Sequence, residues 1–241
     1  MLVNIKRKQK GFTLIEIMIA LMLGLIVIGG ALSIYISTIR GSTDVTNSAR
    51  LNYDLDSAMQ LMTNDIRRAG YWGGATVDSD ARSNPFMSAT ANIQISNYTD
   101  DDAVTHTNGC IVYSYDSNGN NAIDENEYFG FRLDRGAIWT RSTVDVSGGD
   151  DPTNCTDGDN WNRIIDENKI NIDSLSFTTN HKCLNVNVDT TCAVTALVAG
   201  DEAIEVRQIN ISITGQVIGD LNVDKTLTSF VKIRNNRIYT F

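Results

Sequence analysis

The chain has 241 residues, with 20 basic and 29 acidic side chains and a formal net charge of −9. This acidic balance argues against nucleic-acid binding, which needs a basic patch or stripe. The four cysteines form no Cys-x-x-Cys pair and there are only two histidines, so the spacing does not favour a zinc site.

The N-terminal region combines a basic flank with a long apolar run. Four basic residues lie within Lys6–Lys10, and the run from Phe12 to Ile39 contains one charged residue, Glu16, and no proline. The run is longer than the roughly 18 apolar residues that indicate a membrane span. The basic flank places the N-terminus on the cytoplasmic side. No small-residue cleavage site follows a short apolar core, so we expect the segment to stay in the mature protein.

The stretch Lys10-Gly11-Phe12-Thr13-Leu14-Ile15-Glu16 resembles the class III signal of type IV pilins and type II secretion pseudopilins. The resemblance implies that residues 1–11 are a leader, which a membrane aspartyl peptidase, the prepilin peptidase, removes after Gly11. It also implies that this enzyme methylates the new N-terminal amine of Phe12. With the leader gone, 16 basic side chains stand against 29 acidic ones, and the net charge becomes −13.

Glu16 is a carboxylate inside the apolar segment. A charged side chain at the bilayer centre costs about 2.5–3.5 kcal/mol, so such a residue usually marks a function. The resemblance implies that Glu16 pairs with the methylated Phe12 amine of an adjacent subunit. The alternative is that Glu16 lies near the membrane interface and is hydrated.

Residues 12–70 are predicted to form one continuous helix, with 12–39 as the transmembrane or filament-core part. The second half is amphipathic, and its apolar stripe should pack on the C-terminal domain. The stripe consists of Ala49, Leu51, Leu55, Ala58, Met59, Met62, Ile66 and Ala69. Gly24, Gly29 and Gly30 indicate either a soft segment or the ordinary tolerance of membrane helices for glycine. The helix should stop at Gly70–Gly74, and residues 65–71 resemble the helix end of PilW-type minor pilins.

Residues 71–241 are predicted to form a globular, β-rich periplasmic domain. Evenly spaced strands without intervening helices imply an antiparallel sheet. The expected strands cover residues 93–95, 110–115, 128–133, 137–141, 170–177, 204–213 and 227–233, with a glycine turn at 134–136 and polar loops at 75–109 and 142–162. With the long helix on one face of the sheet, the fold class is α+β. The resemblance implies the same pilin ladle fold.

The four cysteines all follow the membrane segment. An even number of cysteines in a translocated domain suggests disulfides. Cys110, Cys155, Cys183 and Cys192 allow three pairings. We favour Cys183–Cys192, which closes a short loop and leaves Cys110–Cys155.

One acidic loop has the spacing of a calcium loop. Oxygen-bearing side chains occupy its first, third, fifth, ninth and twelfth positions, and the seventh residue would offer a carbonyl. These candidate ligands are Asp116, Asn118, Asn120, Ala122, Asp124 and Glu127. Glycine stands at the fourth position (Gly119) rather than the sixth, and the flanks read as strands. The prediction is a modest-affinity calcium turn between two strands, and the alternative is a polar hairpin loop.

The sequence shows no catalytic constellation, so we do not expect an enzyme. The resemblance implies a minor pilin in a tip complex that primes type IV pilus assembly and supports twitching motility and adhesion. The implied partners are other minor pilins, the major pilin, a PilY-type adhesin, the prepilin peptidase and the inner-membrane assembly platform, with no nucleic acid. The protein would span the inner membrane once before assembly, with its C-terminal domain in the periplasm, and lie at the filament tip afterwards.

Two alternatives stay open at this point. One is a J-type pseudopilin of type II secretion, which shares the signal and a large β domain. The other belongs to a different class: a membrane-anchored periplasmic binding or enzymatic domain.

Overall fold

The computed structural model describes residues 11–76, 78, 80–88, 91–100, 102–156, 160–165, 168–192 and 197–241, without the side chains of 220–222. The predicted leader therefore lies outside the described residues, apart from Gly11. The chain forms two compact units, 1–47 and 48–241.

The first unit contains the start of helix α1, which runs without a break from Leu14 to Ile66. The backbone carbonyl of Thr13 accepts bonds from the N–H groups of Glu16 and Ile17 and opens the helix. Within the described part of the chain, α1 is the helix that is both long enough and apolar enough to cross a membrane. The side chains of its apolar part are exposed. The helix is thus slightly shorter than the predicted range of 12–70, and residues 67–70 form turns.

The second half of α1 belongs to the second unit and supplies part of its core. The predicted apolar stripe is confirmed except at Ala49, which is exposed. The buried helical residues are Leu51, Leu55, Ala58, Met59, Met62 and Ile66, and Ala69 is buried just beyond the helix. The second compact unit comprises residues 48–241, so it contains this part of α1 together with the β-rich region.

Five antiparallel strands form the first sheet, in the order β1-β2-β3-β4-β5. Their bounds are β1 Gln94–Thr99, β2 Thr105–Ser114, β3 Tyr128–Asp134, β4 Ala137–Arg141 and β5 Trp161–Arg163. The predicted β3–β4 hairpin is confirmed, with Asp134 opposite Ala137. Arg135 and Gly136 both have positive φ, 48° and 68°, as a tight two-residue hairpin turn requires.

The second sheet has the order β10-β8-β6-β7, and β9 pairs with β8. Its strands are β6 Ile170–Asn185, β7 Thr190–Thr191, β8 Glu202–Val217, β9 Asp220–Lys232 and β10 Arg237–Thr240. The sequence predicted an antiparallel sheet, and the structure has two. Alternation identifies strands and their buried faces but carries no information about which strands pair, so the division into two sheets was not predicted.

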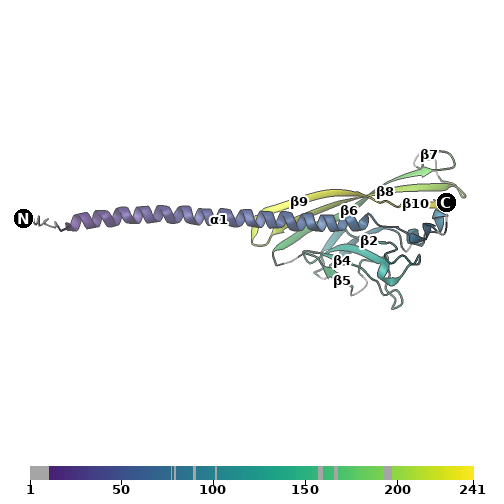
Figure 1. Cartoon of the computed structure of the whole chain (residues 1–241), viewed down its shortest axis with the longest axis horizontal. Coiled ribbons are helices and arrows are strands. Elements are labelled where there is room, and N and C mark those ends of the chain that lie inside the picture. The colour runs from purple at the N-terminus through teal and green to yellow at the C-terminus, as the bar shows by residue number, and fades with distance from the viewer. Residues whose placement is uncertain are drawn as a thin grey trace, which may run out of the picture. The chain divides into compact units, whose positions relative to one another are not determined.

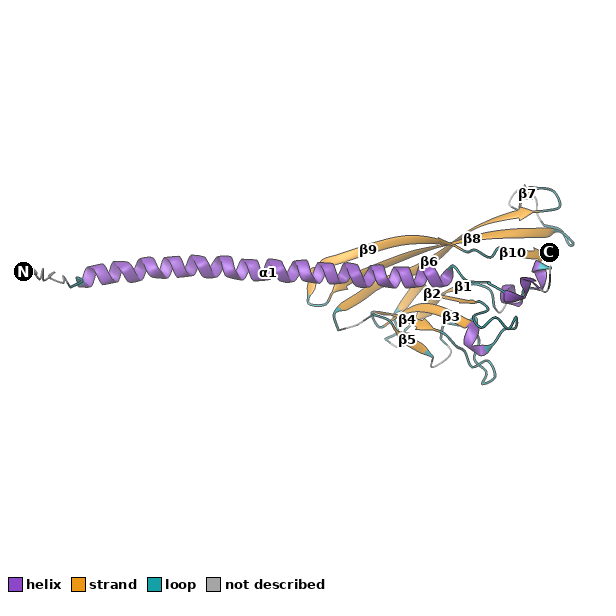
Figure 2. Ribbon diagram, in the orientation of Figure 1, coloured by secondary structure: helices purple, strands orange, loops and turns teal. Residues whose placement is uncertain are grey.

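One hydrophobic core joins the helix to both sheets. It contains Leu55 and Met62 of α1, Phe131 of the first sheet, and Phe177 and Ile211 of the second. Figure 1 shows β6, β8 and β9 running beside the second half of α1, with β2, β4 and β5 on its other side in this view. The same strands and helix are coloured by type in Figure 2.

Four short 3₁₀ helices lie in the connecting segments: η1 Gly73–Thr76, η2 Ala81–Ser83, η3 Pro85–Met87 and η4 Glu125–Glu127. Asp80 and Asn84 cap η2 and η3, because each side chain accepts a bond from the N–H two residues later. The predicted loop at 75–109 thus contains the end of η1, all of η2 and η3, strand β1 and the first half of β2.

Candidate functional site

The predicted processing residues lie at the start of α1. Gly11 and Phe12 precede the helix and are exposed, and Glu16 occupies its first turn. The Thr13 N–H lies 3.4 Å from Glu16 Oε2, in the arrangement of half a capping box. The neighbouring side chains on this face are apolar, namely Phe12, Ile17, Ala20, Leu21, Leu25 and Ile28. The Glu16 carboxylate therefore lies on an otherwise apolar helix surface, which can pack against lipid or another helix.

The end of α1 is fixed to the first sheet by a carboxylate. Asp65 accepts hydrogen bonds from the hydroxyls of Tyr113 (2.5 Å) and Tyr115 (3.1 Å), and it also pairs with Arg68. Burial, followed by the negative charge of Asp65, raises the pKa of both tyrosines, so both hydroxyls stay protonated and act as donors. Tyr115 also stacks on Phe129, with ring centroids 4.1 Å apart.

Beyond the helix, the chain bonds to the end of β2 and the loop that follows it. The Gly70 N–H donates to the Ser114 carbonyl (2.8 Å), and the Asp116 N–H donates to the Tyr71 carbonyl (2.9 Å). Gly74 packs so closely on the Trp72 ring that a Cβ would come within 2.3 Å of it. Residues 70–74 thus form a docking segment that binds the end of β2 and the loop after it. The missing side chain at Gly74 leaves room for the Trp72 ring.

Two of the predicted calcium ligands are buried acceptors of backbone N–H groups. Asp116 Oδ1 accepts from Gly119 (2.6 Å) and Asp116 Oδ2 from Gly73 (3.0 Å). Glu127, which is fully buried, accepts from Ser117 (2.7 Å) at Oε1 and from Asp124 (3.2 Å) at Oε2. Both carboxylates therefore close the loop by binding protein donors.

The other predicted ligands surround Asp124. Its Oδ2 accepts from the side-chain amides of Asn118 (2.8 Å) and Asn120 (2.7 Å). The Ala122 N–H donates to Asn120 Oδ1 (2.9 Å). No group of three or more His, Cys, Asp or Glu side chains in the described part of the chain is placed to hold a metal ion.

These residues do not fit a calcium cage in this arrangement. The spacing correctly predicted a compact loop rich in oxygen atoms. It could not show that the carboxylates of Asp116 and Glu127 turn toward backbone N–H groups. Calcium binding stays a prediction, and this geometry does not favour it.

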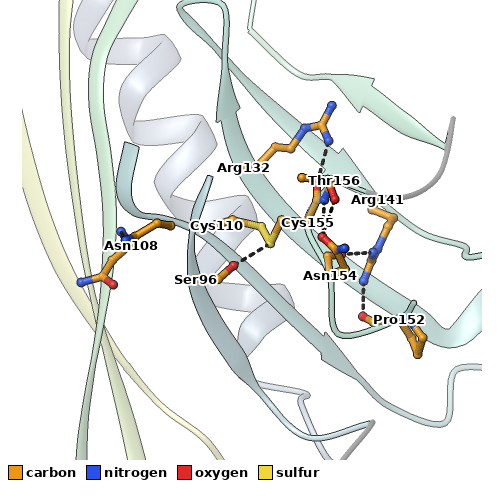
Figure 3. Close-up of a disulfide and its surroundings, with 10 residues drawn as sticks. Ser96, Asn108, Cys110, Arg132, Arg141, Pro152, Asn154, Cys155 and Thr156 are labelled. Atoms are coloured by element: carbon orange, nitrogen blue, oxygen red, sulfur yellow. Dashed lines mark hydrogen bonds between the residues drawn. A yellow bond between two sulfur atoms is a disulfide. The ribbon is translucent and has the colours of Figure 1, made fainter. Parts of the chain in front are cut away.

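The first disulfide, Cys110–Cys155, is buried beside β2 (Figure 3). Ser96 Oγ lies 3.2 Å from Cys155 Sγ, and Arg132 donates to the Cys155 carbonyl (2.7 Å). Arg141 reaches the same loop and donates to the carbonyls of Asn154 (2.9 Å) and Pro152 (2.8 Å). The loop is therefore held by one covalent bond and two guanidinium groups.

The second disulfide, Cys183–Cys192, closes the β6–β7 hairpin. The Cys192 N–H also donates to the Cys183 carbonyl (3.1 Å). Both pairs are the ones that the sequence favoured. Disulfides of this kind agree with folding in an oxidising compartment.

Sequence reasoning missed the structural role of the two arginines. The Arg132 guanidinium lies over the rings of Tyr98 (4.6 Å) and Trp161 (4.5 Å), and Arg141 is almost fully buried. The available signal was an arginine inside each of two strands rich in apolar residues. Burying a charged residue there is costly unless the charge is paired or hydrogen-bonded.

Two family models match the chain. One, described as prepilin peptidase-dependent protein B, matches residues 44–233, and one described as the prokaryotic N-terminal methylation motif matches residues 6–32. The first match covers well over half of the chain. The chain belongs to the prepilin peptidase-dependent protein B family. The comparisons with curated proteins and with solved structures gave no match.

Membership of the prepilin peptidase-dependent protein B family confirms the resemblance to pilin-like proteins. The methylation-motif match includes Gly11, Phe12 and Glu16. The family match begins inside the second half of α1 and includes Asp65, the docking segment at 70–74, and all four cysteines. The individual roles of these residues stay predictions.

Proposed function

We propose that this prepilin peptidase-dependent, pilin-like protein is a PilW-like minor subunit of a type IV pilus, in a tip complex that primes assembly. One observation supports this most strongly. A methylation motif leads directly into a continuous helix whose apolar N-terminal part carries a single carboxylate, Glu16, in its first turn. The second half of that helix is built into the core of a disulfide-bonded domain.

The proposal gives each part of α1 a physical role. Before assembly, the apolar part rests in the inner membrane and the domain lies in the periplasm. During assembly, the exposed apolar side chains leave lipid and pack against the helices of neighbouring subunits. Glu16 then loses its access to water and needs a cationic partner. The Phe12 amine of an adjacent subunit keeps its positive charge after methylation and would pair with Glu16, which fixes the axial register.

The proposed partners follow from that role. The prepilin peptidase would cut after Gly11, and the inner-membrane assembly platform would extract the mature helix. Other minor pilins, the major pilin and a PilY-type adhesin would contact the subunit at the filament tip. We infer a low copy number, because the β-rich domain is larger than that of a typical major pilin.

We also propose that the domain acts by assembly rather than by catalysis. His106 is held by a 3.0 Å bond to Asp100, and His181 is exposed on β6. Asp116 and Glu127 are occupied by backbone N–H groups. These bonds give His106, Asp116 and Glu127 structural roles, which supports a non-enzymatic role.

The test is complementation of a deletion strain with the wild-type gene, Gly11→Ala or the matched control Gly24→Ala. Wild type and Gly24→Ala should restore surface pili and twitching, and purified protein should begin with a methylated Phe12. Gly11→Ala should remain uncut and restore neither. Normal pili and twitching in the deletion strain would contradict the priming role. A secretion defect with normal pili would instead indicate a J-type pseudopilin.

A further inference from the structure

A groove of about 530 Å³ lies at the C-terminal end of edge strand β9, next to Arg67, the residue that follows α1. Its lining combines basic and aromatic side chains with the backbone of Val231 and Ile233, whose side chains are buried in the core. The lining residues are Arg67, Phe230, Val231, Lys232, Ile233, Arg234 and Asn236. The Arg234 N–H lies 3.4 Å from the Arg67 carbonyl and holds the two sides of the groove together.

The three cations of this groove have no carboxylate partner within the described residues. Arg67, Lys232 and Arg234 are absent from every ion pair there, and no Asp or Glu lines the groove. Six other arginines of the same unit do pair with carboxylates: Arg50, Arg68, Arg82, Arg132, Arg135 and Arg237. A concentration of unpaired positive charge is therefore unusual in a chain whose mature net charge is −13.

A buried arginine adds a further positive charge next to the groove. Arg207 is 5% exposed, and its Nη2 donates to the backbone carbonyl of Asn235 (3.1 Å), between two groove-lining residues. Its other partners are Asn92 and the Met87 sulfur, and its Nε has no partner among the described residues. None of these contacts neutralises its charge.

The composition of the groove indicates a protein partner. Phe230 is 67% exposed at the groove, and arginine with an aromatic side chain is the combination enriched at protein–protein interfaces. Three cations are too few for the extended basic stripe of a nucleic-acid site, and an acidic chain repels long polyanions. A short protein segment with a few carboxylates avoids that repulsion and matches the local charge.

We propose that this groove docks an acidic segment of a neighbouring pilin-type subunit, with its carboxylates facing Arg67, Lys232 and Arg234. The identity of the neighbour rests on the proposed function, whereas the preference for carboxylates rests on the groove alone. The exposed ring of Phe230 would contact an apolar side chain that flanks those carboxylates.

The first experiment measures carboxylate binding by the full chain in detergent micelles, with a fluorescent hexaglutamate peptide at low salt. Lys232→Gln/Arg234→Gln should weaken binding about three- to tenfold, from the loss of two exposed charge contacts. Lys169→Gln/Lys182→Gln removes the same charge elsewhere and should leave binding unchanged. Equal weakening in both variants, or a stronger preference for duplex DNA or inorganic phosphate than for the peptide, would overturn the proposal.

The second experiment places a photo-crosslinking phenylalanine analogue at Phe230 in pilus-producing cells. We expect a crosslink to an Asp- or Glu-rich segment of another pilin-type subunit, lost in the Lys232→Gln/Arg234→Gln background. Incorporation into sheared pili without such a crosslink, or a crosslink to a non-pilin protein, would overturn the docking proposal while leaving the proposed function intact. An unprocessed protein absent from pili would refute the proposed function, and the peptide assay would still decide the groove.

Discussion

The carboxylate of Asp65 on α1 accepts a 2.5 Å hydrogen bond from the hydroxyl of Tyr113 on β2. Tyr113 is 2% exposed, so its hydroxyl has no access to water as an alternative partner. The bond therefore joins the last turn of the helix to the C-terminal end of β2 at a point where an unpaired group would be costly.

Replacing Asp65 with alanine should lower the free energy of unfolding by about 3 kcal/mol, because two tyrosine hydroxyls lose a charged acceptor. The measurement is urea unfolding of the full chain in detergent, followed by tyrosine and tryptophan fluorescence. Asp56→Ala is the matched control, since Asp56 is exposed on the same helix. Equal stability of the two variants would show that the Asp65 bonds contribute little.

Asp100 should make stability depend on acid pH. Burial acts to raise its pKa, but bonds from the Val104 N–H and the His106 ring outweigh burial, and the pKa lies below the ordinary value. A lowered folded-state pKa gives stability that is present above the unfolded pKa of about 4 and is lost as the pH falls through the folded one.

The thermal midpoint of Asp100→Asn should therefore lie below that of wild type near neutral pH, and the difference should shrink as the pH falls below about 4. Asp102→Asn, a change at an exposed neighbour, should track the wild type throughout. A constant difference between wild type and Asp100→Asn across this range would contradict the assignment.

The two disulfides should contribute unequally. Cys110 and Cys155 are 45 residues apart and Cys183 and Cys192 are 9 apart, so the first bond closes the longer loop. Loop-closure entropy predicts losses of about 4 and about 3 kcal/mol when each pair is replaced by serine. Urea unfolding of the two double variants gives the comparison. A larger loss for the short loop would indicate that contacts around Cys183–Cys192 matter more than chain entropy.

Glu127→Ala should destabilise the domain by about 2–3 kcal/mol, because the backbone N–H groups of Ser117 and Asp124 lose their buried acceptor. Glu127→Gln keeps an acceptor and should lose less. Adding calcium to wild type should leave the thermal midpoint unchanged, with magnesium as the control. A calcium-specific rise that disappears in Asp124→Ala would restore the calcium-loop hypothesis.

Periodicity was enough to predict much of this fold. The stripe through Leu55 and Met62, the hairpin around Gly136 and the alternating strands β6, β8 and β9 are all visible as local patterns. The two-sheet division was not, because pairing depends on contacts between distant segments. Strand β10 was missed as well, since Arg237–Thr240 is too short to show alternation.

The candidate sites divide in the same way. Gly11, Phe12 and Glu16 form a contiguous motif that sequence alone can locate. The groove could not be predicted, because Arg67 and Lys232 come from opposite ends of the domain sequence and meet only after β9 pairs with β8. The loop at Asp116 shows a different limit: side-chain spacing says which oxygens are available, but the direction of backbone N–H groups decides which of them those groups bind.

The continuity of α1 into the core has a mechanical consequence. A tension that enters the domain at Ser48 along the helix acts on Leu51, Leu55, Met62 and the Asp65–Tyr113 bond side by side, not one after another. Contacts loaded together share the force, so the helix resists being drawn out of the domain better than it would resist being peeled away sideways. The residues that stabilise the domain in the absence of force would thus also hold it to the helix under tension.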